Sequence, residues 1–179
     1  MGLVQVDTYT IGTAASSITL GGGSGGSSGL NASIDSDDVY MVTLTDFQAA
    51  NDTVVRCFRV TKSGSADATA NYDSTFKGLY ADAGFSQSAT PNTTNVSWGW
   101  NGTQTHEKAY GVWYLYNFNN SSEYSFGTFH AQGINYAGNL RGYAGGFVHT
   151  VASASDGINF HVHDNSNITS GTFTLYKVT

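Results

Sequence analysis

The densest run of chemically active side chains is the stretch 161–164, His-Val-His-Asp. In an extended strand, His161 and His163 would project from one face roughly 7 Å apart, as a metal site built on a sheet requires. A stable metal site needs a third or fourth ligand, and the sequence spacing of His130 and His149 does not identify either of them as that ligand. The pattern therefore favours two partly exposed histidines on the solvent side of a strand, without a metal.

Residues for covalent or acid–base catalysis are present but not arranged for it. No Gly-x-Ser-x-Gly turn leads from a strand to a helix, as a serine nucleophile requires. Cys57 falls in the middle of an expected strand and has the sequence context of a small core residue. Glu107 and Glu123 are the only glutamates, whereas glycosidases use two opposed carboxylates. The sequence predicts a protein that is not an enzyme.

Two polar stretches resemble ligand loops in part. The tract 21–29 contains Gly-x-Gly-x-x-Gly, but aspartates and serines follow it and no helix begins there to receive a phosphate. Its glycines and serines predict a flexible loop at 21–29. Asp35-Ser36-Asp37-Asp38 resembles the opening of a calcium loop, yet the turn glycine and the distal glutamate are missing. A solvated turn is expected here, and no cofactor is predicted.

The two tryptophans of Trp98-Gly99-Trp100 are the candidate ligand contacts. Strict strand alternation places both indoles on one face, with Gly99 on the other. Paired aromatic rings can form a platform for sugar rings, and they can equally fill the core of a sandwich. Exposure of Trp98 and Trp100 in the folded chain distinguishes these alternatives.

The composition predicts an all-β fold in a single domain spanning residues 1–179. The chain is 40% hydrophobic but only 11% charged, against roughly 25% in typical soluble domains. Ser, Thr, Asn and Gly must therefore form most of the polar surface, and these residues favour strands and turns over helices. The net charge of −6 argues against a nucleic-acid partner. No apolar run is long enough to predict a membrane span.

About ten short β-type segments separated by turn residues predict a single β-sandwich with a jelly-roll-like topology. Residues 39–47 and 53–61 are expected to pair as a hairpin across the turn residues between them. The only proline, Pro91, is expected in a loop. The last segment, 171–178, is expected to be a buried strand, with Phe173 and Leu175 on its core face.

Four passages carry a resemblance to a known family. They are Asp38–Val42, Ala70–Asp73, Tyr114–Phe126 and Asn165–Val178. Together they resemble small virion structural proteins of tailed phages, common among phages that infect aquatic bacteria. The resemblance spans most of the chain and departs from the family at the Gly21–Gly29 tract and at Lys177, where glycine is common. It implies a component of the phage particle without catalytic residues, and no binding residue can be transferred from it.

The function expected from this resemblance is that of a virion protein. We expect a capsid decoration or head-fibre protein on the particle exterior, because no shaft repeat or coiled coil typical of a tail fibre is visible. The alternatives are a tail or tail-tip component, or a carbohydrate-binding module that contacts host glycans. Expected partners are other phage structural proteins of capsid or tail and further copies of this chain. One cysteine and no signal-peptide pattern in residues 1–7 predict synthesis in the host cytoplasm.

Overall fold

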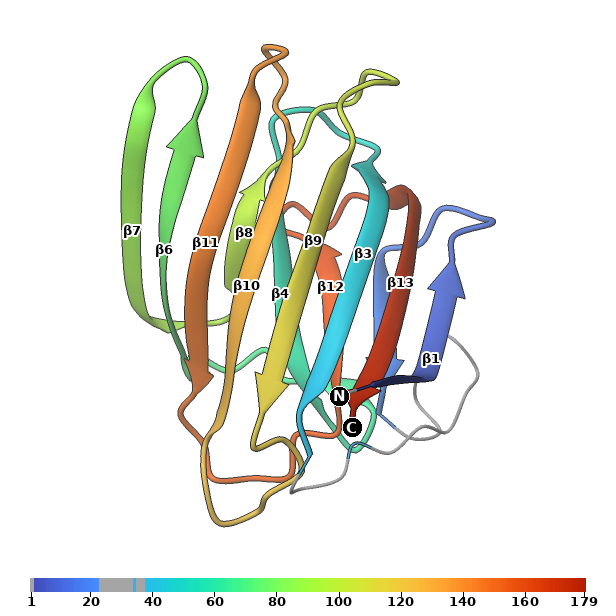
Figure 1. The fold of residues 1–179 in the computed structure, drawn as a ribbon, viewed down its shortest axis with the longest axis vertical. Coiled ribbons are helices and arrows are strands. Elements are labelled where there is room, and N and C mark those ends of the chain that lie inside the picture. Colours follow the sequence, from blue (N-terminus) through green and yellow to red (C-terminus); the bar gives the residue numbers. More distant parts are fainter. Residues whose placement is uncertain (1, 23–33, 35–37) are drawn as a thin grey trace.

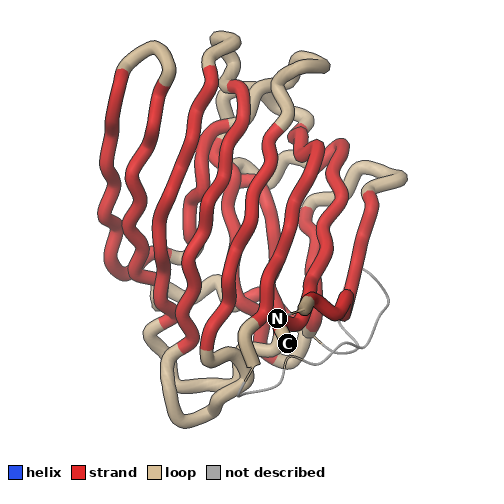
Figure 2. The backbone as a smooth tube through the Cα atoms, in the orientation of Figure 1, coloured by secondary structure: helices blue, strands red, loops and turns tan. Residues whose placement is uncertain are grey.

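The computed structural model describes residues 2–22, 34 and 38–179. Within this part the chain forms strands and no helix (Figure 2). The strands are β1 (Leu3–Thr10), β2 (Ser17–Gly21), β3 (Tyr40–Ala49), β4 (Val55–Lys62), β5 (Ser65–Ala66), β6 (Tyr72–Tyr80), β7 (Gly84–Thr93), β8 (Val96–Trp100), β9 (Ala109–Tyr116), β10 (Ser125–Ile134), β11 (Leu140–His149), β12 (Gly157–Val162) and β13 (Ile168–Val178). The prediction of an all-β fold is confirmed.

The strands build two antiparallel sheets that lie face to face (Figure 1). The larger sheet has eight strands in the order β1-β13-β3-β9-β10-β11-β6-β7. The smaller sheet has the order β2-β12-β4-β5, and β8 pairs with β4. Successive strands β1 to β4 alternate between the two sheets, as strands of a jelly roll do, whereas β9, β10 and β11 are sequential neighbours. The architecture is a β-sandwich, as the sequence predicts.

Strand alternation explains which residues fill the space between the sheets. Along β10, every second side chain from Ser125 to Gly133 is buried, and the side chains between them are exposed. The aromatic rings of both sheets then meet edge to face. Phe58 of β4 lies 4.8 Å from Phe147 and 6.2 Å from Trp113 between ring centres. Such pairs contribute about 0.5–1.5 kcal/mol each beyond the burial of their area.

The closing strand is a buried strand of the larger sheet, as predicted, and it lies next to the edge strand β1. β13 pairs with β1 on one side and with β3 on the other. Phe173 and Leu175 are fully buried in the core. The ring of Phe173 lies 5.3 Å from that of Phe160 in the opposite sheet, so this strand ties the two layers together.

The structure corrects three local predictions. β3 and β4 do not form a hairpin, because they lie in opposite sheets and the short link between them crosses the sandwich. The alternation of polar and apolar residues shows which face of a strand is buried, but it does not show which other strand pairs with it. Pro91 lies inside β7, an edge strand that pairs only with β6, where a residue without an N–H group is tolerated. Gly21 of the expected loop 21–29 ends strand β2, and residues 23–29 lie outside the described residues.

Candidate functional site

The two candidate tryptophans lie in different environments. Trp98 is fully buried, and its ring packs edge to face against Trp113 at 5.1 Å and Phe47 at 5.3 Å. Trp100 ends strand β8 and is 45% exposed. The expectation that both indoles share one face is therefore wrong, and only Trp100 is accessible to a ligand in this conformation.

A bulge between β4 and β8 separates the two indoles. Val55 lies opposite Trp100 and Cys57 lies opposite Ser97, so Arg56 alone faces the two residues Trp98 and Gly99. Gly99 has a φ of 126°, which favours glycine. A side-chain carbon there would approach both Nη2 of Arg56 and Cε2 of Tyr143 to 2.5 Å. A glycine inside a strand pattern is a known sign of a bulge, so the sequence did carry this signal.

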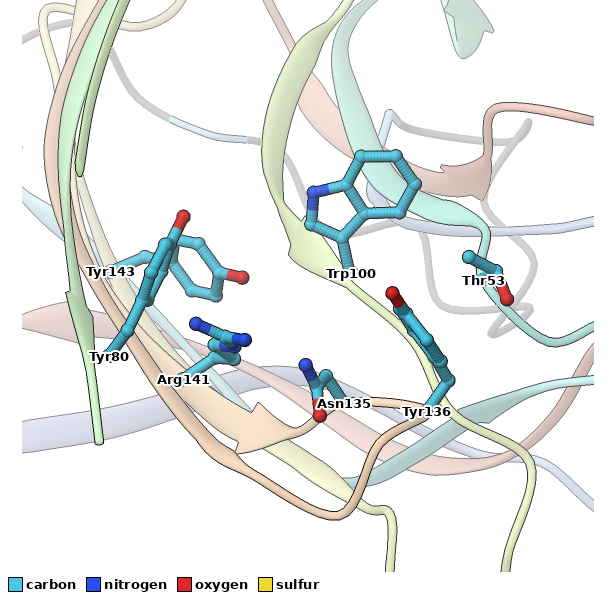
Figure 3. Close-up of a pocket in the computed structure, with 7 residues that line it drawn as sticks. All are labelled: Thr53, Tyr80, Trp100, Asn135, Tyr136, Arg141 and Tyr143. Carbon is cyan, nitrogen blue, oxygen red and sulfur yellow. The ribbon is translucent and has the colours of Figure 1, made fainter. Parts of the chain in front are cut away.

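Trp100 forms part of the rim of a pocket of about 250 Å³ at one end of the sandwich. That end lies opposite the two chain termini (Figure 1). The volume is slightly below the roughly 300 Å³ at which small-molecule pockets begin, so it suits a single ring-sized group. The lining residues come from five parts of the chain (Figure 3): Thr53, Tyr80, Trp100, Asn135, Tyr136, Arg141 and Tyr143. We call this the Trp100 pocket.

The polar groups of the Trp100 pocket are held in fixed orientations. Arg141 binds the carboxylate of Asp82 through both terminal nitrogens at 2.8 Å, and its guanidinium stacks 4.2 Å from the ring centre of Tyr80. The side-chain oxygen of Asn135 accepts the backbone N–H groups of Ala137 and Asn139. This leaves the amide nitrogen of Asn135 as a donor, and it points toward Arg141 and Trp100 (Figure 3).

A second arginine lies behind the pocket wall. Arg56 is fully buried, and none of its guanidinium nitrogens has a hydrogen-bond partner among the described residues. Its charged group lies 4.4 Å from the ring centre of Trp98. Burial lowers the pKa of Arg56 from 12.5 to about 10, although Tyr143 acts in the opposite direction. Along β4, Arg56 alternates with Phe58 and Val60, and the face that these three side chains share is the core.

The histidine pair does not meet in one site. His161 lies in β12, one residue before its end, and is 6% exposed, because β2 and β4 flank this strand on both sides. His163 lies in the following turn and is exposed. The expectation of two partly exposed histidines is thus wrong for His161. Burial, with a smaller effect of Arg59, lowers the pKa of His161 to about 4.

The other candidates from the sequence are also far from a catalytic arrangement. Cys57 is buried in β4, and burial raises the pKa of its thiol to about 12. Of the aspartate run, residues 35–37 lie outside the described residues, and Asp38 forms an ion pair with Lys177. Among the described residues, no three His, Cys, Asp or Glu side chains gather as a metal site. In the same part of the chain, no helix is long and apolar enough to cross a membrane.

One polar cluster was missed in the sequence. The carboxylate of Asp67 lies 2.7 Å from Nζ of Lys62 and 3.1 Å from Nε2 of the fully buried His149. Burial and the nearby Lys62 lower the pKa of His149. These contacts tie the segment after β5 to strands β4 and β11. Lys62 and Asp67 are close in the chain, but His149 lies 82 positions from Asp67, so only the fold brings it to them.

Comparison with known proteins adds no relative. No protein-family model matches this chain, and no curated protein matches it.

Proposed function

We propose that this protein is a structural component of a bacteriophage particle, placed on the capsid exterior as a decoration or head-fibre protein. The support comes from the passages that resemble virion proteins and from the strands on which they fall. Tyr114–Phe126 joins β9 to β10, and Asn165–Val178 contains β13. Asp38–Val42 begins β3, which lies between β13 and β9. Three of the four passages therefore fall on neighbouring strands of the larger sheet, β13, β3, β9 and β10.

The observation that carries the proposal is the outer face of β9 and β10. Neither strand contains a Lys, Arg, Asp or Glu residue. Tyr116 and Phe126 lie opposite each other on these strands and are both exposed. Exposed aromatic rings without charges are typical of contact surfaces, since such a surface loses little hydration energy on docking. This face suits attachment to other particle proteins or to further copies of the chain.

Mass spectrometry and a density map of purified particles test the proposal directly. We expect the protein in the particle at many copies per capsid, with the β9–β10 face against a neighbouring protein. A copy on the tail would favour the tail or tail-tip alternative, and absence from the particle would refute both.

A charge placed on the proposed face gives a second test. Phe126→Lys should abolish binding of the purified protein to particles that lack it, while the melting temperature stays close to that of the wild type. Ser122→Lys adds the same charge at an exposed loop position and should bind normally. Equal binding of both variants would contradict the assignment of this face.

The Trp100 pocket supports carbohydrate binding as a second function. Trp100 and Tyr136 are 45% and 54% exposed and flank the same small pocket. Flat aromatic rings bind the apolar faces of sugar rings. A host-surface glycan is the ligand expected of a protein on a particle exterior, and a glycan array is the first measurement. The two functions are compatible, because the pocket lies at the end of the sandwich and the β9–β10 face lies on its side.

A further inference from the structure

The hydrogen-bonding groups of the Trp100 pocket are mainly donors. The guanidinium of Arg141 makes no hydrogen bond to a described residue other than Asp82, so its remaining N–H groups are available. The amide nitrogen of Asn135 is fixed as a donor because the turn occupies its oxygen. The indole of Trp100 can only donate. No lining residue carries a carboxylate. The pocket therefore matches a ligand group rich in acceptors.

A buried cation, Arg56, also lies beside the pocket. Asp82 compensates Arg141, but no carboxylate and no other acceptor among the described residues is bonded to Arg56. Arg56 and Tyr143 meet at the same point beside Gly99, so the uncompensated cation lies directly behind a pocket wall. A buried charge acts strongly at this range, because little water screens it. One uncompensated positive charge fits a ligand with one negative charge.

We infer that the Trp100 pocket binds an acidic saccharide whose ring stacks on Trp100 and Tyr136 and whose carboxylate accepts hydrogen bonds from Arg141 and Asn135. This inference rests on the carbohydrate-binding function proposed above and names the ligand class. Arg56 contributes as a positioning charge and does not touch the ligand. A carboxylate of the ligand can accept from the N–H groups of Arg141 that Asp82 leaves unused, with the amide nitrogen of Asn135 as the second donor.

Titration calorimetry with methyl glucuronide and methyl glucoside tests the inference, because these probes differ only at C6, where a carboxylate replaces a hydroxymethyl group. We expect the glucuronide to bind at least about tenfold more tightly at low salt, the gain typical of one charge-assisted hydrogen bond. This preference should shrink as salt concentration rises. Acetate alone should bind far more weakly, since it has no ring to stack. Binding of neither sugar would refute carbohydrate binding altogether. Equal affinity for both would refute only the acidic ligand.

Three variants and one control sharpen the test. Asn135→Asp keeps an oxygen for the turn but replaces the donor with a negative charge, so the preference for glucuronide should disappear or reverse. Arg56→Met should reduce the preference several-fold without removing a contact group. Trp100→Ala should abolish binding of both sugars. Tyr124→Ala removes an aromatic ring of similar exposure at the other end of β10 and should change nothing. An unchanged preference in Asn135→Asp, tighter binding of a sulfated glucoside, or equal binding of acetate would overturn the inference.

Discussion

Replacement of Arg56 by methionine should make the protein more stable, although Arg56 is fully buried and contacts a core tryptophan. The guanidinium of Arg56 has no hydrogen-bond partner among the described residues, so the fold holds a charge in an apolar place without compensation. Methionine has a similar length and adapts to irregular space, so it should fill the site without a large cavity. Replacement of buried charges by apolar side chains of similar volume often stabilises a protein by about 1–4 kcal/mol.

The size of the effect follows from the pKa of Arg56. Burial lowers this pKa from 12.5 to about 10, and a difference of this size corresponds to about 3 kcal/mol. The folded state binds the proton less tightly than the unfolded state, so this cost is fully present below pH 10. It is relieved only as the pH rises from about 10 toward 12.5. The cation–π contact with Trp98 offsets about 1–2 kcal/mol of the cost.

The expected net gain of Arg56→Met is therefore about 1–2 kcal/mol at pH 7. For a chain of this length the melting temperature should rise by about 2–8 °C. Scanning calorimetry and urea unfolding measure both quantities. Arg59→Met is the matched control on the same strand, where a partly exposed arginine donates to the carbonyl of Thr94, and it should lose about 1 kcal/mol or less. A loss of more than about 1 kcal/mol in Arg56→Met would refute the reasoning, because the charge would then stabilise the fold.

Three further predictions concern the core and its titratable groups. Cys57 should not react with a thiol reagent at pH 8 in the native protein, because burial raises the pKa of the thiol to about 12. It should react once the protein is unfolded in urea, and rapid reaction of the native protein would contradict its burial. Stability should fall as the pH drops from about 6.5 to about 4, because His161 binds a proton in the unfolded state at a higher pH than in the folded state. His161→Phe should flatten this part of the curve of melting temperature against pH, and an unchanged slope would exclude His161 as a cause. Phe173→Ala should lower the free energy of unfolding in urea by about 3–5 kcal/mol, because it leaves a cavity in the core. Deletion of residues 171–179 should give insoluble protein, and a soluble truncated chain with an unchanged melting temperature would show that β13 is dispensable.

The sequence predicts most strands because their faces differ in polarity. β10 alternates strictly between buried and exposed residues, and β13 presents Phe173 and Leu175 on one face. β7 was missed for the opposite reason. As an edge strand it buries neither face fully, so the segment from Gly84 to Thr93 shows no apolar period. The wrong hairpin of β3 and β4 has another cause: short links can join strands within one sheet or between two sheets, and only the global packing decides.

The candidate site was predictable only in part. The sequence singled out Trp100 as one of a pair of tryptophans, but it could not supply the partners. These come from loops and strands twenty or more positions away from Trp100, such as Thr53, Tyr80 and Asn135. Trp98 was assigned to the same face because strict alternation ignores the bulge at Gly99. The sequence holds another local signal that was not used: Arg56 is a charged residue on a strand face shared with the apolar Phe58 and Val60. A buried charge of this kind points to a functional site more directly than an exposed aromatic residue does.

The bulge at Gly99 connects the unusual features of this end of the sandwich. It directs Trp98 into the core, where its ring faces the guanidinium of Arg56, and it leaves Trp100 at the pocket rim. Stability alone would favour an apolar residue in place of Arg56 and an ordinary residue with negative φ in place of Gly99. Arg56 and Gly99, the two residues that lower stability, both lie beside Tyr143, which lines the pocket. Natural proteins accept local instability mainly where function requires it, so the combination argues for ligand binding at this end and not for packing alone.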